Sequence, residues 1–501
     1  MRTPSRTLPV LIPLALAVSC ACSTTAGDGG GYRPEPWLED LDALEAHMGS
    51  VYANLEWIVE RRGLDLPALD RRTRAAIRAA GSERAAHGAL EEFVAAFDDP
   101  HFGIERRRPR LIGWLFRLGG DDQKDTREDS PVFETGASGR EVCESFGYRD
   151  RDHGFEFDVG ALPRWSALPS DGAFPAGVFV LPGDRGVGIL RIEHFAEDGY
   201  REACAAEWDA GSDGRTGPCS EECLEAFRKL ASHALARRVV RRVAELKAAG
   251  VQTLVVDVTG NGGGTEWVDP VTRIFSANAL RATRVTTVRH PRGVRPMTDE
   301  LAAVEVGLAD PALPDSTRAV LGEARDRLSA LLAELQAPCD RSPMWEGRDP
   351  GCRQTIEAPS YTTGVFDWLP PGALEGYAGR ADLYSPFGRD VPSGVWTGTL
   401  YLLADRGSAS ATEGFVAMLK DNGAATVVGE RTYGAGCGFL DGGLPLELPN
   451  SGLDVWMPDC ARFRIDGTNE IEGIAPDVPI AWSDLGGSER ARALVEVLSH
   501  R

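Results

Sequence analysis

The sequence predicts an α/β fold, because amphipathic helices alternate with short buried strands in two separate stretches. In the first stretch, the amphipathic segment 223–249 leads to the apolar run TLVVDV at 253–258. In the second, the run GTLYLLAD at 398–405 is followed by a helix-like segment at 411–423 and then by ATVVG at 425–429. Continuous apolar runs joined by helices are typical of parallel strands covered on both faces.

Length and charge limit the classes of function. At 501 residues the chain is long enough for two or three domains. Its formal net charge of −21 argues against nucleic acid as a partner. No phosphate-binding loop, zinc-binding helix or nucleotide fingerprint occurs, so we expect no cofactor and no metal. The oligomeric state stays open.

The first 22 residues resemble a bacterial lipoprotein signal. Arg2 and Arg6 precede an apolar run from Leu8 to Val18, and small residues and cysteines follow. That run is too short to span a bilayer, so residues 1–22 are expected to be an export signal with a lipobox. Cys20 would carry the lipid, and residues 23–36 would form a flexible spacer. The protein is therefore expected in the cell envelope, periplasmic or on the surface, and to touch the membrane only through its lipid anchor. Simple secretion is the alternative.

The remaining cysteines fit an oxidising compartment. Eight follow the signal, at positions 143, 204, 219, 223, 339, 352, 437 and 460. An even number in an exported chain favours disulfides over metal binding. We expect the sequence neighbours Cys339 with Cys352, and Cys437 with Cys460, to pair, although sequence alone leaves the connectivity open.

The chain divides into segments of different pattern. Apolar residues at helical spacing predict a helical bundle at 37–104. Residues 105–180 show no clear pattern and stay unassigned. A catalytic core is expected at 181–485, with an insertion at 281–395 that contains a helix around 315–336, and a C-terminal helix at 486–501.

Four motifs follow one another along the chain: VGILRIEHF at 187–195, LVVDVTGNGGG at 254–264, the long stretch from Leu400 to Gly436, and EGIAPDV at 472–478. In this order they resemble the tail-specific, or C-terminal processing, protease family. The resemblance covers roughly 185–280 and 396–482. It implies a Clp/crotonase-like core and serine peptidase activity on peptides or protein tails.

The resemblance also implies how the serine would act. The nucleophile would be Ser410 rather than Ser408, at the N-terminus of a helix where backbone N–H groups favour an oxyanion. The amides of Ala411 and Gly263 would form the oxyanion hole. A helix N-cap is the structural alternative for Ser410.

The base of the tail-specific proteases is missing. Their lysine would fall at Ala435, and the nearest of the four lysines in the chain, Lys420, lies ten residues along the helix from Ser410. That spacing is roughly 15 Å. The tricorn-core-like branch of the family uses a histidine instead, and His101 in DDPHF matches it, although the neighbouring Pro100 and Phe102 depart from that pattern.

A third catalytic residue is expected near the C-terminus. The tricorn pattern places it at Glu470, with Glu472 as the off-register alternative. His194 is a spare candidate for the base, and Asp421 matches a family aspartate that could orient or cap locally. Because the lysine is absent, an inactive family member that binds ligands or peptides in the envelope is the alternative function.

Overall fold

The computed structural model describes most of the chain. The described residues are 32–106, 132–133, 138–151, 153–211, 217–218, 221–264, 267–337, 339–357, 364–384, 391–440 and 443–500. The expected signal segment, Cys20 and most of the spacer lie outside them, as does much of the unassigned segment 105–180. No helix among the described residues is both long and apolar enough to cross a membrane.

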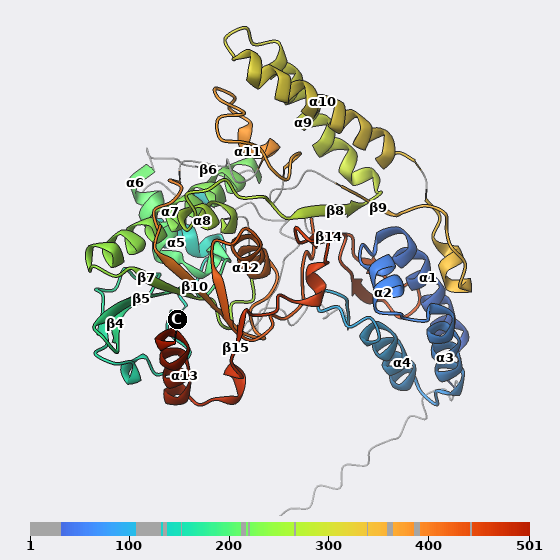
Figure 1. Ribbon diagram of the computed structural model, residues 1–501. Coiled ribbons are helices and arrows are strands. Elements are labelled where there is room, and N and C mark those ends of the chain that lie inside the picture. Colours follow the sequence, from blue (N-terminus) through green and yellow to red (C-terminus); the bar gives the residue numbers. More distant parts are fainter. Residues whose placement is uncertain are drawn as a thin grey trace, which may run out of the picture.

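A seven-stranded mixed sheet forms the centre of the molecule, in the order β15-β11-β10-β7-β5-β4-β3 (Figure 1). Five neighbouring strands run parallel, and β4 and β3 add an antiparallel edge. The strands are β3 (Ser166–Ala167), β4 (Ala176–Leu181), β5 (Arg185–Arg191), β7 (Thr253–Asp257), β10 (Thr399–Ala404), β11 (Thr426–Gly429) and β15 (Val478–Pro479). The predicted α/β fold is confirmed.

Alternate residues of the central strands face two different cores. On β7, Leu254 and Val256 pack with residues of α7 (Glu221–Ala248), α8 (Val268–Ile274) and α12 (Ala411–Asp421). The residue between them, Val255, faces the opposite side and packs with residues of α13 (Gly487–Ser499). The period of two along the strand therefore explains why the run is apolar throughout.

The N-terminal region forms a helical bundle with its own core. Its helices are α1 (Glu35–Val51), α2 (Leu55–Arg61), α3 (Leu66–Ala79) and α4 (Glu83–Ala95). Residues of a small sheet join the same core, and its strands are β1 (Gly103–Arg106), β12 (Leu446–Glu447) and β13 (Leu453–Trp456). Strand β1 follows the bundle and pairs with β13 near the C-terminus, so the bundle is joined to the end of the chain.

A long helical hairpin projects from the body of the molecule (Figure 1). It consists of α9 (Val294–Leu308) and α10 (Asp315–Leu335), where sequence predicted a single helix around 315–336. The hairpin follows β8 (Arg284–Val288), which pairs with β14 (Cys460–Phe463) and with β9 (Thr355–Glu357). The remaining strands and α-helices of the described residues are β2 (Val132–Phe133), α5 (Gly139–Ser145), α6 (Arg201–Gly211), β6 (Gly217–Pro218) and α11 (Arg380–Leu383).

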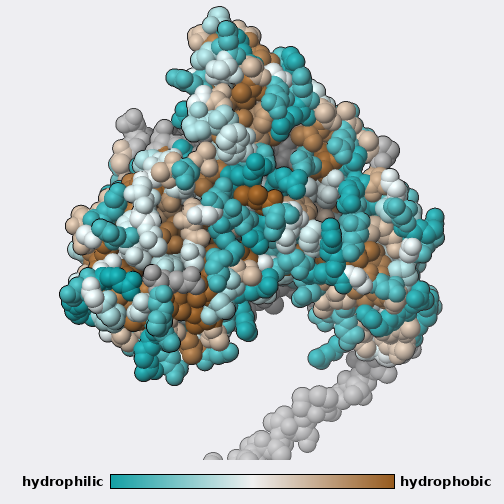
Figure 2. All heavy atoms as spheres, viewed as in Figure 1, coloured by the Kyte–Doolittle hydropathy of each residue, from teal (hydrophilic) through white to brown (hydrophobic). Residues whose placement is uncertain are grey.

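Three disulfides are present among the described residues. Cys339–Cys352 and Cys437–Cys460 confirm the two predicted pairs, and Cys143–Cys204 joins α5 to α6. Such bonds persist in compartments outside the reducing cytoplasm, which is consistent with an exported protein. Hydrophilic residues cover much of the face seen in Figure 2, and that face is hollowed between the bundle and the part of the core that carries α13.

Candidate active site

Ser410 lies in a sharp turn between β10 and α12. Its backbone has φ 55° and ψ −117°, in a region that a residue with a side chain rarely adopts. Such strain is found where the surrounding structure fixes a functional geometry. The Ser410 residue is partly exposed, whereas Ser408 is fully buried and its hydroxyl donates to the carbonyl of Val258 at 2.8 Å. The two candidate serines therefore differ: the hydroxyl of Ser408 already holds the turn together.

The glycine turn after β7 packs directly against this serine. Gly263 has φ 99°, and a Cβ placed there would lie 2.8 Å from both the Ser410 Cβ and the Ala411 nitrogen. Only glycine allows this approach. Ala411 is the first residue of α12, where an N–H group has no acceptor within the helix. The Gly263 amide instead donates to the Asn261 Oδ1 at 3.0 Å, so it is engaged in this structure.

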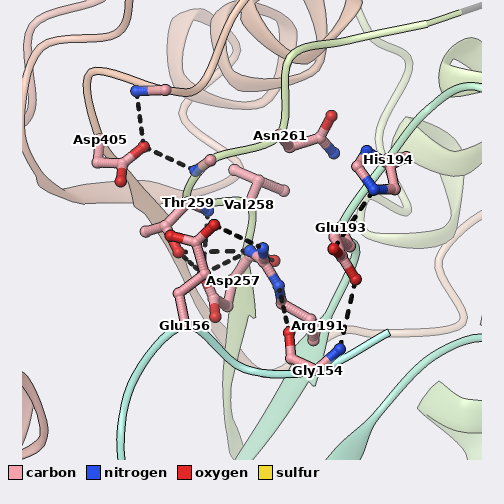
Figure 3. Close-up of polar contacts among 12 residues, drawn as sticks. Gly154, Glu156, Arg191, Glu193, His194, Asp257, Val258, Thr259, Asn261 and Asp405 are labelled. Carbon is pink, nitrogen blue, oxygen red and sulfur yellow. Dashed lines mark hydrogen bonds and ion pairs between the residues drawn. The ribbon is translucent and has the colours of Figure 1, made fainter. Parts of the chain in front are cut away.

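Hydrogen bonds with residues at the ends of β7 and β10 hold the glycine turn in place (Figure 3). The buried Asp257 accepts from Arg191 at 3.2 Å and from the Thr259 hydroxyl at 2.7 Å. Asp405 accepts from the Gly260 amide at 2.8 Å and thereby connects the turn after β7 with the turn after β10. These contacts fix the carboxyl ends of two parallel strands, where ligands bind in open α/β sheets.

A buried carboxylate joins the turn of Ser410 to the loop at 432–436. Glu413 is fully buried and accepts five hydrogen bonds. They come from the Ser410 amide (3.0 Å), the Thr432 hydroxyl (2.6 Å) and the amides of Gly434 (2.8 Å), Ala435 (2.8 Å) and Gly436 (2.9 Å). Hydrogen bonds to an ionised acceptor are stronger than neutral ones. Glu413 was not predicted from the sequence, although its position three residues after Ser410 fits a capping-box pattern.

His101 is oriented by the same loop. Its Nδ1 lies 3.0 Å from the carbonyl oxygen of Ala435. A carbonyl can only accept, so Nδ1 carries the hydrogen of this bond, and in the neutral ring Nε2 keeps a lone pair. The Phe439 ring stands edge-on to the imidazole at 5.6 Å between centroids. A Cβ at Gly438 would come within 2.8 Å of Nε2, so glycine is needed beside this ring.

Asp99 fixes the backbone of His101. The buried carboxylate accepts from the His101 amide at 3.1 Å, and from the Tyr52 hydroxyl and the Asn54 side-chain amide at 2.9 Å each. Burial raises the pKa of Asp99, and the charge of His101 opposes this effect. Asn54 also accepts from the side-chain amide of Asn469 at 2.9 Å. This chain of bonds links the helical bundle to the residue before Glu470.

Glu470 is linked to Ser410 through Arg462. It is fully buried in a short 3-10 turn (Glu470–Glu472) and accepts from the Arg462 Nε at 2.5 Å. Arg462 also donates to the carbonyl of Ser410 at 2.5 Å. Burial raises the pKa of Glu470 to about 7, against the lowering effect of Arg462 and with a further increase from Glu413. Arg462 is a second residue of this site that was not predicted from the sequence.

The other candidates lie elsewhere. Glu472 accepts from Trp57 at 2.8 Å and from Arg62 at 2.9 Å, both from the helical bundle. His194 lies beside Glu193, 3.4 Å from its carboxylate, on the segment after β5 (Figure 3).

Two further charged candidates form local ion pairs. Lys420 pairs with Asp477, and Asp421 accepts from Arg464 at 3.0 Å. Within the described residues, no hydrogen bond joins the Ser410 hydroxyl to His101, and no group of three or more His, Cys, Asp or Glu could hold a metal ion.

The model of peptidase family S41 matches residues 186–480, which is more than half of the chain. The chain belongs to this family. The match includes the strand β5, the glycine turn, Ser410, the loop 432–436 and Glu470, whereas His101 and Asp99 precede it. The family assigns the general chemistry, hydrolysis of peptide bonds, to the part of the chain in which the Ser410 turn lies.

Solved structures support the fold of this S41 chain. The structure of mature CPAF complexed with lactacystin is similar with a TM-score of 0.55 at 14% identity, and the alignment covers 93% of this chain and 98% of that one. Mature CPAF is similar with a TM-score of 0.54 at 16% identity, over 93% and 97%. At these identities the likeness shows the fold alone, a mixed α/β fold with a Clp-like core. A search of curated proteins found no match.

Proposed function

We propose that this chain is an exported serine peptidase that cleaves peptides or protein tails through an acyl-enzyme. Ser410 is the nucleophile, His101 the base, Glu470 the assisting carboxylate, and the amides of Ala411 and Gly263 the oxyanion hole. One observation carries the proposal: Glu413 holds the amides of Ser410 and Ala435, and the carbonyl of the same Ala435 orients His101. The loop thus connects a strained serine to an imidazole with a free lone pair.

The base follows from the chemistry of the ring. With Nδ1–H held by the Ala435 carbonyl, Nε2 is the atom that can remove the proton of the serine hydroxyl. Ala435 stands where the tail-specific proteases carry their lysine, and here its backbone supports a histidine. This arrangement supports placing the chain near the tricorn-core-like branch, which uses a histidine base.

The charge that develops on the substrate needs two donors. The Ala411 amide at the start of α12 supplies one, because helix N-termini favour negative charge. The Gly263 amide supplies the second after it leaves the Asn261 Oδ1. The substrate carbonyl therefore competes with the Asn261 side chain for that donor.

Glu470 acts through Arg462 rather than on the imidazole. Arg462 donates to both the Glu470 carboxylate and the Ser410 carbonyl, so it fixes the backbone of the nucleophile. Glu470 is thus a positioning residue. Removal of this carboxylate is expected to alter kcat more than KM.

Labelling of the purified protein with a fluorophosphonate probe tests the proposal. We expect the wild type to be labelled, and Ser410→Ala and His101→Ala to lose the label while far-UV circular dichroism and thermal unfolding stay unchanged. His194→Ala is the matched control for the base and keeps the label. If the folded wild type is not labelled, the chain is instead a ligand- or peptide-binding member of the family, which the engaged Gly263 amide would favour.

Export and lipid anchoring form a separate part of the proposal. The three disulfides support an oxidising compartment. Mass spectrometry of the protein purified from membranes is expected to find an acylated N-terminal Cys20, and Cys20→Ala is expected to release the protein from the membrane fraction. A mature N-terminus elsewhere would argue for simple secretion.

A further inference from the structure

One disulfide lies inside the candidate active site. Cys437 follows the loop 432–436, and Cys460 begins β14, two residues before Arg462. Their Cα atoms are 5.6 Å apart, and both residues are buried. The bond therefore joins the loop that contacts His101 to the strand whose arginine holds Ser410.

The neighbours of Cys437 contact both halves of the site. On one side, the Gly436 amide donates to Glu413 at 2.9 Å, and its carbonyl accepts from Arg462 at 3.5 Å. On the other side, Gly438 packs against the His101 ring, and its carbonyl accepts from the Asp459 amide at 3.2 Å. A shift of Cys437 would move the carbonyl of Ala435 and the glycine beside the imidazole together.

The loop has few other restraints at this end. Residues 430–439 contain no helix or strand, so no regular backbone ladder holds them. Glu413 fixes the amides of residues 434, 435 and 436, and beyond them the covalent bond at Cys437 and the contacts with Asp459 fix the chain. A crosslink stabilises a loop by removing the conformations in which its ends separate.

We propose that the Cys437–Cys460 disulfide is a positioning element of the active site, and that the chain gains full peptidase activity only when these two thiols are oxidised. This inference rests on the proposed function. In the reaction, two thiols lose two protons and two electrons as one S–S bond forms, and a disulfide oxidant is reduced to two thiols. The peptidase would be idle in a reducing cytoplasm and would become active after export.

Two other disulfides among the described residues provide matched controls. Cys339–Cys352 spans 13 residues, and the segment it encloses contains the short turn Ser342–Glu346, which packs on the helical bundle. Cys143–Cys204 joins α5 and α6. Neither cysteine pair adjoins a residue of the candidate site along the chain, whereas Cys437 lies two residues after Ala435.

The experiment compares Cys437→Ser/Cys460→Ser with Cys339→Ser/Cys352→Ser in the purified protein. With a fluorogenic peptide substrate, the first variant is expected to lose at least about tenfold in kcat with a smaller change in KM. The reason is that the disulfide positions the catalytic groups rather than the bound substrate. The control is expected to stay within about twofold of the wild type. Dithiothreitol should lower the activity of the wild type and of the control, but not further lower that of the first variant. Equal kcat in the two folded variants would overturn the proposal.

A second variant and a second readout cover the remaining outcomes. If the serine variant does not fold, Cys437→Ala/Cys460→Val fills the buried space with apolar groups and takes its place. Nitrogen-15 chemical shifts of the His101 ring report its tautomer without need of activity. A wild type that is inactive but loses its Nδ1–H tautomer on reduction would contradict the proposed function and support the positioning role. An unchanged tautomer in the reduced protein would contradict the positioning role itself.

Discussion

The two halves of the candidate site are built in different ways. The nucleophile half combines Ser410, Ala411 and Glu413, all within one turn and the first turn of α12. The base half combines residues that are far apart in the chain: Asn54, Asp99 and His101 come from the bundle region, and Ala435 and Asn469 from the C-terminal part.

This difference determines how each half can fail. The nucleophile half lies within the core: Ser410, Ala411 and Glu413 are close in sequence, and the glycine turn after β7 packs against them. The base half exists only when the bundle is docked, because the separation along the chain between His101 and Ala435 is 334 residues. Undocking would remove the base and leave the strained serine turn in place. Four predictions test this comparison, from the largest expected effect to the smallest.

Removal of the imidazole tests the base half most directly. His101→Ala is expected to lower kcat/KM by roughly 100- to 10,000-fold, the usual contribution of a general base. Stability should change little, because the ring is partly exposed and makes one hydrogen bond. Steady-state kinetics with a peptide substrate measures the effect, with His194→Ala as the control. Comparable losses in the two variants would mean that His101 has no special role.

Glu413 is the point at which the two halves meet. Glu413→Gln replaces one acceptor oxygen by a donor that faces backbone N–H groups, so it is expected to cost about 3 kcal/mol of unfolding free energy or more. Labelling of Ser410 and peptide hydrolysis should fall together. Urea denaturation measures the stability, and a variant as stable as the wild type would show that the loop 432–436 is held by other contacts.

The raised pKa of Glu470 predicts how the stability of the protein depends on pH. Its pKa is raised to about 7 in the folded protein, so folding favours the protonated form. Below the unfolded pKa near 4.5, Glu470 is protonated in both states and does not lower the stability. As the pH rises toward 7, the unfolded state loses this proton first, and the free energy of unfolding falls by up to about 3 kcal/mol. Glu470→Gln should therefore lose less stability than the wild type between pH 5 and pH 7.5 in urea melts. If the stability of the wild type and of Glu470→Gln changed with pH in the same way, the pKa of Glu470 would not be raised.

Glu472 should have the smallest effect. Its contacts with Trp57 and Arg62 are partly exposed, and such interactions contribute about 1 kcal/mol or less. Glu472→Gln is expected to lower stability slightly and to leave kcat unchanged. If kcat fell as far as in Glu470→Gln, the interface with the bundle would control the chemistry. The two halves of the site would then depend on each other.

Patterns local in the sequence predicted much of the fold and part of the site. Apolar runs at 253–258 and 398–405 predicted parallel strands, and they lie side by side as β7 and β10. The pairs Cys339–Cys352 and Cys437–Cys460 were predicted correctly because short loops bring their ends together at low entropic cost. The pair Cys143–Cys204 was not predicted, since a separation of 61 residues gives no local signal.

The amino-acid sequence by itself determined the α/β class and the position of Ser410 at the start of a helix, within a motif that resembles a protease family. These features depend on neighbouring residues and on periodicity. Only the tertiary structure decided what surrounds that serine. It brought the carbonyl of Ala435 to His101, the carboxylate of Glu413 to the loop, and Arg462 between Glu470 and Ser410. Contacts of this kind follow from how helices and strands pack, and packing is set by the whole core rather than by any single segment.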